Sequence, residues 1–236
     1  MINSAGDQIN ADLGMWNFGD GVEKKFDSHV RKSVPGYDLS HQLVSLLSDP
    51  FIKKGSKIVD LGCSTGTLER ILFDRHSKKD PEIIGIDNQS NMIKKAVELS
   101  AGYPIKYINE DLTNYKMPKA IDLIISFYTL QFISPAVRQD LVNRIFNSLN
   151  WGGGFFLFEK VRAPDARFQD YINHAFMNYK LNNFSANEVI GKANSLIGVL
   201  EPFSTLGNTE MLQRAGFKDI CTISKFLCFE GFLAIK

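Results

Sequence analysis

The feature that most constrains the fold is a regular alternation of strand-like and helix-like segments through the middle of the chain. Apolar segments with strand character occupy residues 57–63, 82–87, 105–111, 121–128 and 151–160, and amphipathic helical patterns occupy 67–76, 90–100 and 137–149. Because parallel neighbouring strands need a crossover, usually a helix, this alternation predicts a doubly wound, Rossmann-like α/β sheet. The almost wholly apolar run "IDLIISFY" is typical of a central strand covered on both faces.

The segments on either side of this alternation predict a single domain, residues 1–236, with appendages. Residues 1–47 are expected to form an N-terminal helical cap that is interrupted at Pro35-Gly36, and residues 163–208 a helical lid insertion. A helix at 209–217 precedes "DICTISKF" and "CFEGFLAIK", which predict a closing pair of antiparallel strands.

The charge balance and the cysteines limit the class of protein. The chain has 236 residues, with 27 Lys and Arg against 26 Asp and Glu and a net charge of +1, so it offers no general basic surface to nucleic acid or an anionic membrane. Its three cysteines have no metal-ligand spacing. There is no signal-peptide pattern, and no run reaches the ~18 apolar residues of a membrane span. These features predict a cytoplasmic protein without a metal or a membrane contact, and they argue against a nucleic-acid partner.

The turn after the first strand, in "KIVDLGCSTGTLER", is the first indication of a ligand. In doubly wound sheets, ligands bind at the carboxyl ends of the strands. Gly62 and Gly66 flank this turn, where glycine lets the backbone approach a ligand and a helix N-terminus favours an anionic group. Their G-x-x-x-G spacing differs from the dinucleotide fingerprint and favours a ligand with a carboxylate.

Two aspartates follow the next strands. Asp87 ends the second strand, where an acid can accept both hydroxyls of a ribose, and Asp111 ends the third, where it can accept from an adenine amine. Each aspartate could instead be a helix N-cap, and Gly62 and Gly66 could serve only the geometry of the turn. Together with the turn at Gly62, the two acids indicate S-adenosylmethionine as the cofactor.

The chain resembles the class I S-adenosylmethionine-dependent methyltransferases over roughly residues 50–236, through "VDLGCSTG", "GIDNQSNMI", "EDL" and "LNWGGGFFLFEK" in that order. Within that superfamily it is similar to the bacterial carboxy-S-adenosylmethionine synthase family in "RKSVPGY", "DLGCS", "IDN", "YTLQF", "EK" and "AGF". The resemblance implies that Tyr37 closes over the cofactor. It further implies that Gly62, Cys63 and Ser64 line the methionine portion, Asp87 and Asn88 hold the ribose, and Asp111 and Leu112 hold the adenine.

Two departures from the synthase pattern affect the expected reaction. Ser126 stands where the synthase has an asparagine, and Met211 where counting back from "AGF" places an arginine that pairs with the extra carboxylate of the product. A thioether cannot replace a bidentate guanidinium. We therefore expect a methyltransferase that uses ordinary S-adenosylmethionine and a small-molecule acceptor. The alternatives are a true synthase that uses prephenate, in the tRNA wobble-uridine modification pathway, and a cofactor-binding protein without acceptor chemistry.

Methyl transfer depends mainly on positioning, so no obvious catalytic motif is required. The catalytic candidates are Tyr128, Glu159 and His174. Tyr128 could orient an acceptor or pack on the methionine chain, Glu159 could bind substrate with Lys160 or form a structural ion pair, and His174 could be a base or a solvated residue. The aromatic-rich segment 167–184 could stack nucleic-acid bases, but a hydrophobic lid or a homodimer face fits its few basic residues better.

Overall fold

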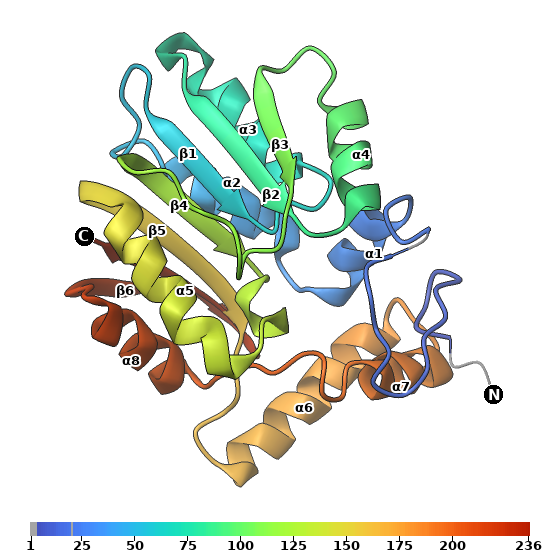
Figure 1. Cartoon of the computed structure of the whole chain (residues 1–236). Coiled ribbons are helices and arrows are strands. Elements are labelled where there is room, and N and C mark those ends of the chain that lie inside the picture. The colour runs from blue at the N-terminus through green and yellow to red at the C-terminus, as the bar shows by residue number, and fades with distance from the viewer. Residues whose placement is uncertain (1–3, 20) are drawn as a thin grey trace.

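The computed structural model describes residues 4–19 and 21–236, and within them a seven-stranded sheet has the order β3-β2-β1-β4-β5-β7-β6 (Figure 1). The strands are β1 (Lys57–Leu61), β2 (Glu82–Asp87), β3 (Ile105–Asn109), β4 (Ile121–Phe127), β5 (Leu149–Lys160), β6 (Asp219–Phe226) and β7 (Phe229–Ile235). Strands β1 to β5 pair in parallel, and β7 pairs antiparallel with β5 and β6. This arrangement confirms the predicted α/β sheet with its C-terminal antiparallel pair.

Helices cover both faces of the sheet. They are α1 (Phe26–Ser33), α2 (Tyr37–Leu47), α3 (Thr67–His76), α4 (Ser90–Leu99), α5 (Pro135–Ser148), α6 (Ala166–Leu181), α7 (Ala186–Ser195) and α8 (Thr205–Ala215), with short 3-10 helices at Ser77–Lys79 and Leu130–Phe132. On one face, α2 and α3 contribute Val44, Leu68 and Leu72 to a buried cluster. On the other, α5 and α8 contribute Leu141 and Leu212. Each fully buried side chain of this kind contributes roughly 1.5–3 kcal/mol, so both layers hold the sheet firmly.

The order of the strands reverses between β1 and β4, and this reversal places the ligand site. The chain leaves β1 toward α3 on one face and leaves β4 toward α5 on the other, as the packing of α3 and α5 into different clusters shows. Because the two connections diverge, a crevice opens at the carboxyl ends of the strands.

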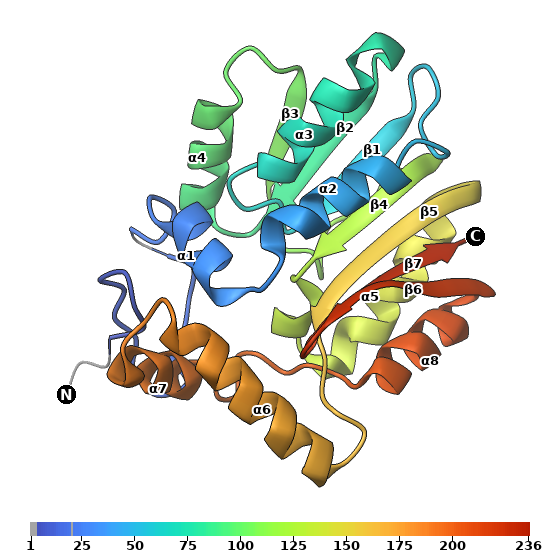
Figure 2. The same cartoon turned by 180° about the vertical axis from the view of Figure 1, so that it is seen from behind.

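Helices α6 and α7 and the N-terminal segment lie together beyond this crevice, outside the layers that cover the sheet (Figures 1 and 2). The N-terminal segment is hydrogen-bonded to the end of α7, where Gly14 N donates to Asn194 O and Trp16 N to Ser195 O, both at 3.0 Å. The N-terminal segment and α7, which are far apart in the sequence, therefore lie side by side.

The boundaries of some elements differ from the sequence-based ones for local reasons. Helix α8 begins at Thr205 rather than 209, because Ser204 Oγ accepts a hydrogen bond from Gly207 N at 3.0 Å and so caps it earlier. Strand β1 ends at Leu61, because Gly62 turns the chain with a φ of 91°. Among the described residues, no helix combines the length and apolar character needed to cross a membrane.

Candidate cofactor and substrate site

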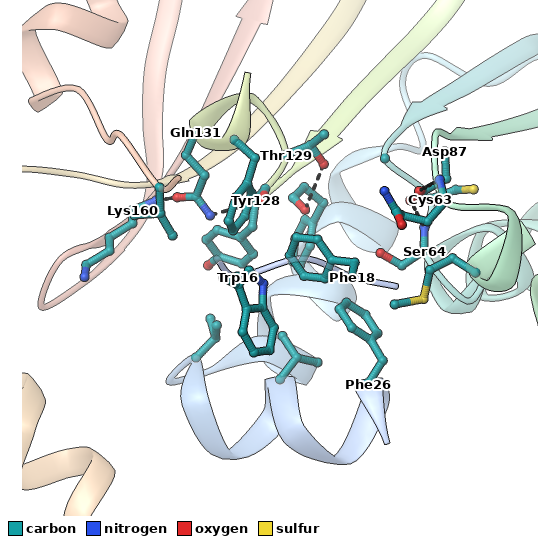
Figure 3. Close-up of a pocket in the computed structure, with 18 of the residues that line it drawn as sticks. Trp16, Phe18, Phe26, Cys63, Ser64, Asp87, Tyr128, Thr129, Gln131 and Lys160 are labelled. Carbon is teal, nitrogen blue, oxygen red and sulfur yellow. Dashed lines mark hydrogen bonds between the residues drawn. The ribbon is translucent and has the colours of Figure 1, made fainter. Parts of the chain in front are cut away.

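A cavity of about 520 Å³ lies between the carboxyl ends of β1, β2 and β4 and the segments beyond them (Figure 3). This volume is within the ~300–1,000 Å³ typical of small-molecule sites. Aromatic side chains from distant parts of the chain line it, among them Trp16, Phe18, Phe26 and Tyr128. An apolar enclosure of this kind excludes water and strengthens the electrostatic interactions of the polar groups that face it.

The turn between β1 and α3 is held against β2 by backbone hydrogen bonds and by one carboxylate. Gly62 N and Cys63 N both donate to Ile86 O, at 2.7 and 3.0 Å. Asp87 Oδ2 accepts from Ser64 N at 3.0 Å, and Asp87 Oδ1 accepts from Gln89 N at 2.8 Å, directly before α4. Ser64 has a φ of 50°, which exposes its backbone at the cavity wall. The carboxylate of Asp87 thus fixes the shape of the turn that faces the ligand.

Asp111 has a similar local role. Its Oδ1 accepts from Thr113 N at 2.7 Å and from Thr113 Oγ1 at 2.6 Å, and these hydrogen bonds lower the pKa of its carboxyl group. Asp87 and Asp111 therefore accept from backbone groups of their local turns, and neither is the N-cap of a helix, since Gln89 is the N-cap of α4. Both also line the cavity, and a carboxylate has about four acceptor positions, so each retains positions for a ligand.

Asp60 is a third acid at this end of the cavity. It is buried near the end of β1, lines the cavity, and its Oδ1 has no hydrogen-bond partner among the described residues. Burial and the nearby charge of Asp87 raise the pKa of Asp60. Unused acceptors at three strand ends fit a ligand with ribose hydroxyls, an adenine amine and positive charge, so the residues present fit S-adenosylmethionine.

An aromatic group closes the side of the cavity next to α2. The rings of Tyr37 and Phe127 lie 5.4 Å apart edge to face, and Tyr37 stacks on Tyr128 at 6.4 Å. Gly36 begins α2 with a φ of 71°, a left-handed conformation that glycine adopts without strain. The "SVPGY" turn thereby aims Tyr37 into the cavity.

The structure brings together most, but not all, of the residues singled out in the sequence. Those that line the cavity are Tyr37, Gly62, Cys63, Ser64, Asp87, Asn88, Asp111, Leu112 and Tyr128. Gly66, Ser126, Glu159 and His174 are not among the lining residues. Gly66 is the N-cap of α3, and Ser126 is fully buried in β4, whereas its neighbour Phe127 faces the cavity. The ring of His174 is exposed on α6, with Nε2 3.1 Å from Asn178 Nδ2.

Glu159 and Lys160 do not form a pair. Successive strand residues point to opposite faces, so Lys160 lines the cavity while Glu159 is buried on the side of Arg138. Burial raises the pKa of Glu159 to about 8, and Arg138 opposes that rise. Glu159 therefore holds its proton in the folded protein over much of the neutral range.

This bound proton makes stability depend on pH. The pKa of Glu159 rises from 4.5 in the unfolded chain to about 8 in the folded protein. The contribution of Glu159 to the free energy of unfolding is therefore fully present below pH 4.5 and is lost as the pH rises through 8. We expect wild type to lose about 2 kcal/mol of unfolding free energy relative to Glu159→Gln between about pH 6 and about pH 8, because glutamine does not titrate. Urea unfolding at both pH values measures this difference, and parallel pH profiles for the two proteins would contradict it.

The opposite end of the cavity is basic. Lys160 at the end of β5, Lys180 on α6 and Lys192 on α7 all line it. Lys180 and Lys192 are 7% and 8% exposed, although lysine is almost never fully buried without a partner. The cavity thus has three aspartates at the strand ends and three lysines at the far end.

Comparison with known proteins decides the family. A family model described as a methyltransferase domain matches residues 58–153. Carboxy-S-adenosyl-L-methionine synthase of Staphylococcus epidermidis is 35% identical over 230 residues, 97% of this chain and 100% of that protein. The protein of the same name from Campylobacter hominis is 36% identical over 224 residues, 94% of each chain. The chain belongs to the carboxy-S-adenosyl-L-methionine synthase family.

Solved structures agree with the fold of this family. Human N-acetylserotonin methyltransferase in complex with S-adenosylmethionine aligns with a TM-score of 0.62 and 18% identity, over 92% of this chain and 56% of that one. The YcgJ protein of Bacillus subtilis aligns with a TM-score of 0.60 and 15% identity, over 80% and 72%. Such identities show a shared fold only. Membership of the synthase family confirms the expectation of an enzyme that uses S-adenosylmethionine.

Because the chain belongs to the synthase family, the surroundings of Met211, which was aligned with an arginine of that family, bear on the reaction. Met211 is 1% exposed and belongs to the core between α5, α8 and the sheet. It does not line the cavity, so its thioether does not occupy a place where a substrate carboxylate would bind. Counting back from "AGF" thus selected a residue on the buried face of α8, and its identity does not decide whether the cavity accepts a carboxylate.

The sequence analysis missed the lysines that α6 and α7 contribute to the cavity. Lys180 and Lys192 belong to no motif in the sequence. A signal was present: each lysine lies one helical turn from apolar residues, Phe176 and Phe184 for Lys180, and Val189 for Lys192. A lysine on an apolar helix face is a candidate for a buried, functional cation.

Proposed function

We propose that the protein is a carboxy-S-adenosylmethionine synthase, which adds a carboxyl group to the methyl carbon of S-adenosylmethionine with prephenate as donor. The opposite charges of the two ends of the cavity carry this proposal. A methyl acceptor needs no particular charge, whereas a donor that brings carboxylates needs cations. The lysine end supplies them.

The residues divide between cofactor and donor. We assign Tyr37, Gly62, Cys63, Ser64, Asp60, Asp87, Asn88, Asp111 and Leu112 to the cofactor end. S-adenosylmethionine supplies a methyl carbon activated by a positively charged sulfur. Tyr128 lies between the two ends: it follows β4 with a φ of 61°, and its backbone N donates to Phe158 O at 2.8 Å. We propose that its ring separates and orients the two ligands, and that residues 163–208 with the N-terminal segment act as a lid.

The reaction balances without a further reagent. A C–H bond of the methyl group and the bond from the prephenate ring to its carboxylate break, and one new C–C bond forms. Hydroxide leaves the ring as it becomes aromatic and takes the methyl proton as water, leaving phenylpyruvate. The enclosed cavity keeps bulk water from the reacting carbon, and positioning contributes most of the rate enhancement.

Mass spectrometry of the ligand that copurifies with the protein tests this function. We expect the carboxylated cofactor, and we expect its formation from S-adenosylmethionine only when prephenate is added. The competing function, methylation of a small acceptor, releases S-adenosylhomocysteine and adds no carboxyl group. Purified protein that turns over an acceptor and never yields the carboxylated compound would refute the proposal.

A further inference from the structure

The three lysines of the cavity come from elements that are far apart in the sequence. Lys160 is fixed at the end of β5 in the sheet, whereas Lys180 and Lys192 lie on α6 and α7. Burial, with a smaller effect from the charge of Lys160, lowers the pKa of Lys180 to about 8. Burial, with a smaller effect from the charge of Lys180, also lowers the pKa of Lys192. The fold therefore gathers three like charges in one place.

None of the three ammonium groups has a hydrogen-bond acceptor or a carboxylate partner among the described residues. The ammonium groups lie against aromatic rings instead. Lys160 Nζ lies 4.9 Å from the ring centre of Phe176, and Lys180 Nζ lies 5.8 Å from the ring centres of Phe176 and Phe184. Lys192 Nζ faces the ring of Trp16. A cation–π contact contributes only about 0.5–2 kcal/mol, much less than the cost of removing an ammonium from water. The acids that line the cavity lie at the ends of β1, β2 and β3.

We propose that Lys160, Lys180 and Lys192 form the binding site for a small dicarboxylate with a ring-sized body, the donor in the reaction proposed above. Two separate carboxylates satisfy three ammonium groups better than one does, because each can accept from two donors. The rings of Phe176, Phe229 and Trp16, which line the same end, provide the surface for the body of the ligand.

This site also links substrate binding to the lid. Without an anion, the charges of Lys180 and Lys192 repel Lys160 and push α6 and α7 away from the sheet. A dicarboxylate bound between the three lysines attracts all of them, so it draws α6 and α7 toward the sheet. The proposal rests on the proposed function for the identity of the donor, but the anion site itself depends only on the lysines.

Calorimetric titration of prephenate into protein saturated with S-adenosylhomocysteine tests the site. We expect Lys180→Met and Lys192→Met each to raise the Kd for prephenate about 10-fold, because each removes a charge-assisted hydrogen bond, and to leave the Kd for S-adenosylhomocysteine unchanged. Lys180→Arg and Lys192→Arg should restore most of the affinity. Lys94→Met, which replaces an exposed lysine of α4, is the matched control and should bind like wild type.

A second measurement separates a binding role from a structural one. Lys192→Met removes a buried charge without a partner, so it should raise the unfolding free energy while it weakens prephenate binding. Lysines that merely support the fold would show the opposite change in stability. Unchanged prephenate affinity in both methionine variants, or an equal loss of S-adenosylhomocysteine affinity, overturns the proposal.

Prephenate binding and product formation together show which of the two proposals fails, the function or the lysine site. Wild-type protein that binds prephenate in a lysine-dependent way but forms no carboxylated cofactor refutes the proposed function and supports the site. Formation of that product with the wild-type KM for prephenate in both variants supports the function and refutes the site.

Discussion

Asp87→Ala is expected to weaken binding of S-adenosylhomocysteine about a thousand-fold. Two hydrogen bonds from ribose hydroxyls to a carboxylate contribute roughly 1.5–3 kcal/mol each, and a thousand-fold change corresponds to about 4 kcal/mol. The substitution also releases Ser64 N and Gln89 N, which Asp87 holds at 3.0 and 2.8 Å. The turn after β1 then loses the shape that faces the ligand. Isothermal titration calorimetry measures the effect directly.

Two comparisons separate the contact with ribose from support of the turn. The analogue of S-adenosylhomocysteine that lacks the 2′-hydroxyl should bind wild type more weakly, and Asp87→Ala should discriminate little between the two compounds. Asp111→Ala, at an exposed carboxylate, should lose only about 10-fold, since an exposed hydrogen bond contributes less. If Asp87→Ala binds S-adenosylhomocysteine within twofold of wild type, the placement of the cofactor at this end of the cavity is wrong.

The cofactor end could be predicted from the sequence because its residues follow strands directly. Once "KIVDL" and "EIIGID" are recognised as neighbouring parallel strands, the positions of Gly62 and Asp87 follow from the rule that ligands bind at the carboxyl edge. A residue in the middle of a strand is less certain. Ser126 and Phe127 are adjacent, yet only Phe127 faces the cavity, because side chains alternate and one residue decides the face.

The substrate end could not be predicted in the same way. Lys160, Lys180 and Lys192 line one cavity only because α6 and α7 lie across it from the carboxyl ends of the strands (Figures 1 and 2), and no local pattern fixes that long-range packing. Trp16 shows the same limit: it lines the cavity through hydrogen bonds between the N-terminal segment and the end of α7. Met211 was misread because a count along the sequence ignores which face of a helix is buried.

The two ends of the cavity differ in the sign of the charged side chains that line them. The acids at the strand ends favour a cation and the lysines favour an anion, which is the arrangement that the proposed pair of ligands requires. Asp87 and Lys160 belong to strands of the sheet, whereas Lys180 and Lys192 are carried by α6 and α7. Under the proposed function, specificity for the donor depends on Lys180 and Lys192 together with Lys160, and specificity for the cofactor on the strand ends.

The conformation of Gly62 makes the turn intolerant of a side chain. Its φ of 91° is a region that L-residues rarely adopt, and a Cβ there would overlap the side chain of Thr129 and lie 2.8 Å from its Cβ. Gly55 has a φ of 72°, but no heavy atom lies within 4 Å of the place that an added Cβ would take, so a substitution there brings the same backbone strain without the overlap. The two glycines therefore separate backbone strain from steric exclusion.

Gly62→Ala is expected to lower the unfolding free energy by about 3 kcal/mol, the sum of roughly 1–2 kcal/mol for the left-handed conformation and a similar amount for overpacking. Gly55→Ala should lose only about 1 kcal/mol. Because the overlap extends to the Cβ of Thr129, Thr129→Gly should recover the steric part in the double variant, whereas Thr129→Ser should not. Chemical denaturation of the four variants measures these differences. Equal losses for Gly62→Ala and Gly55→Ala would show that contact with Thr129 does not set the shape of the turn.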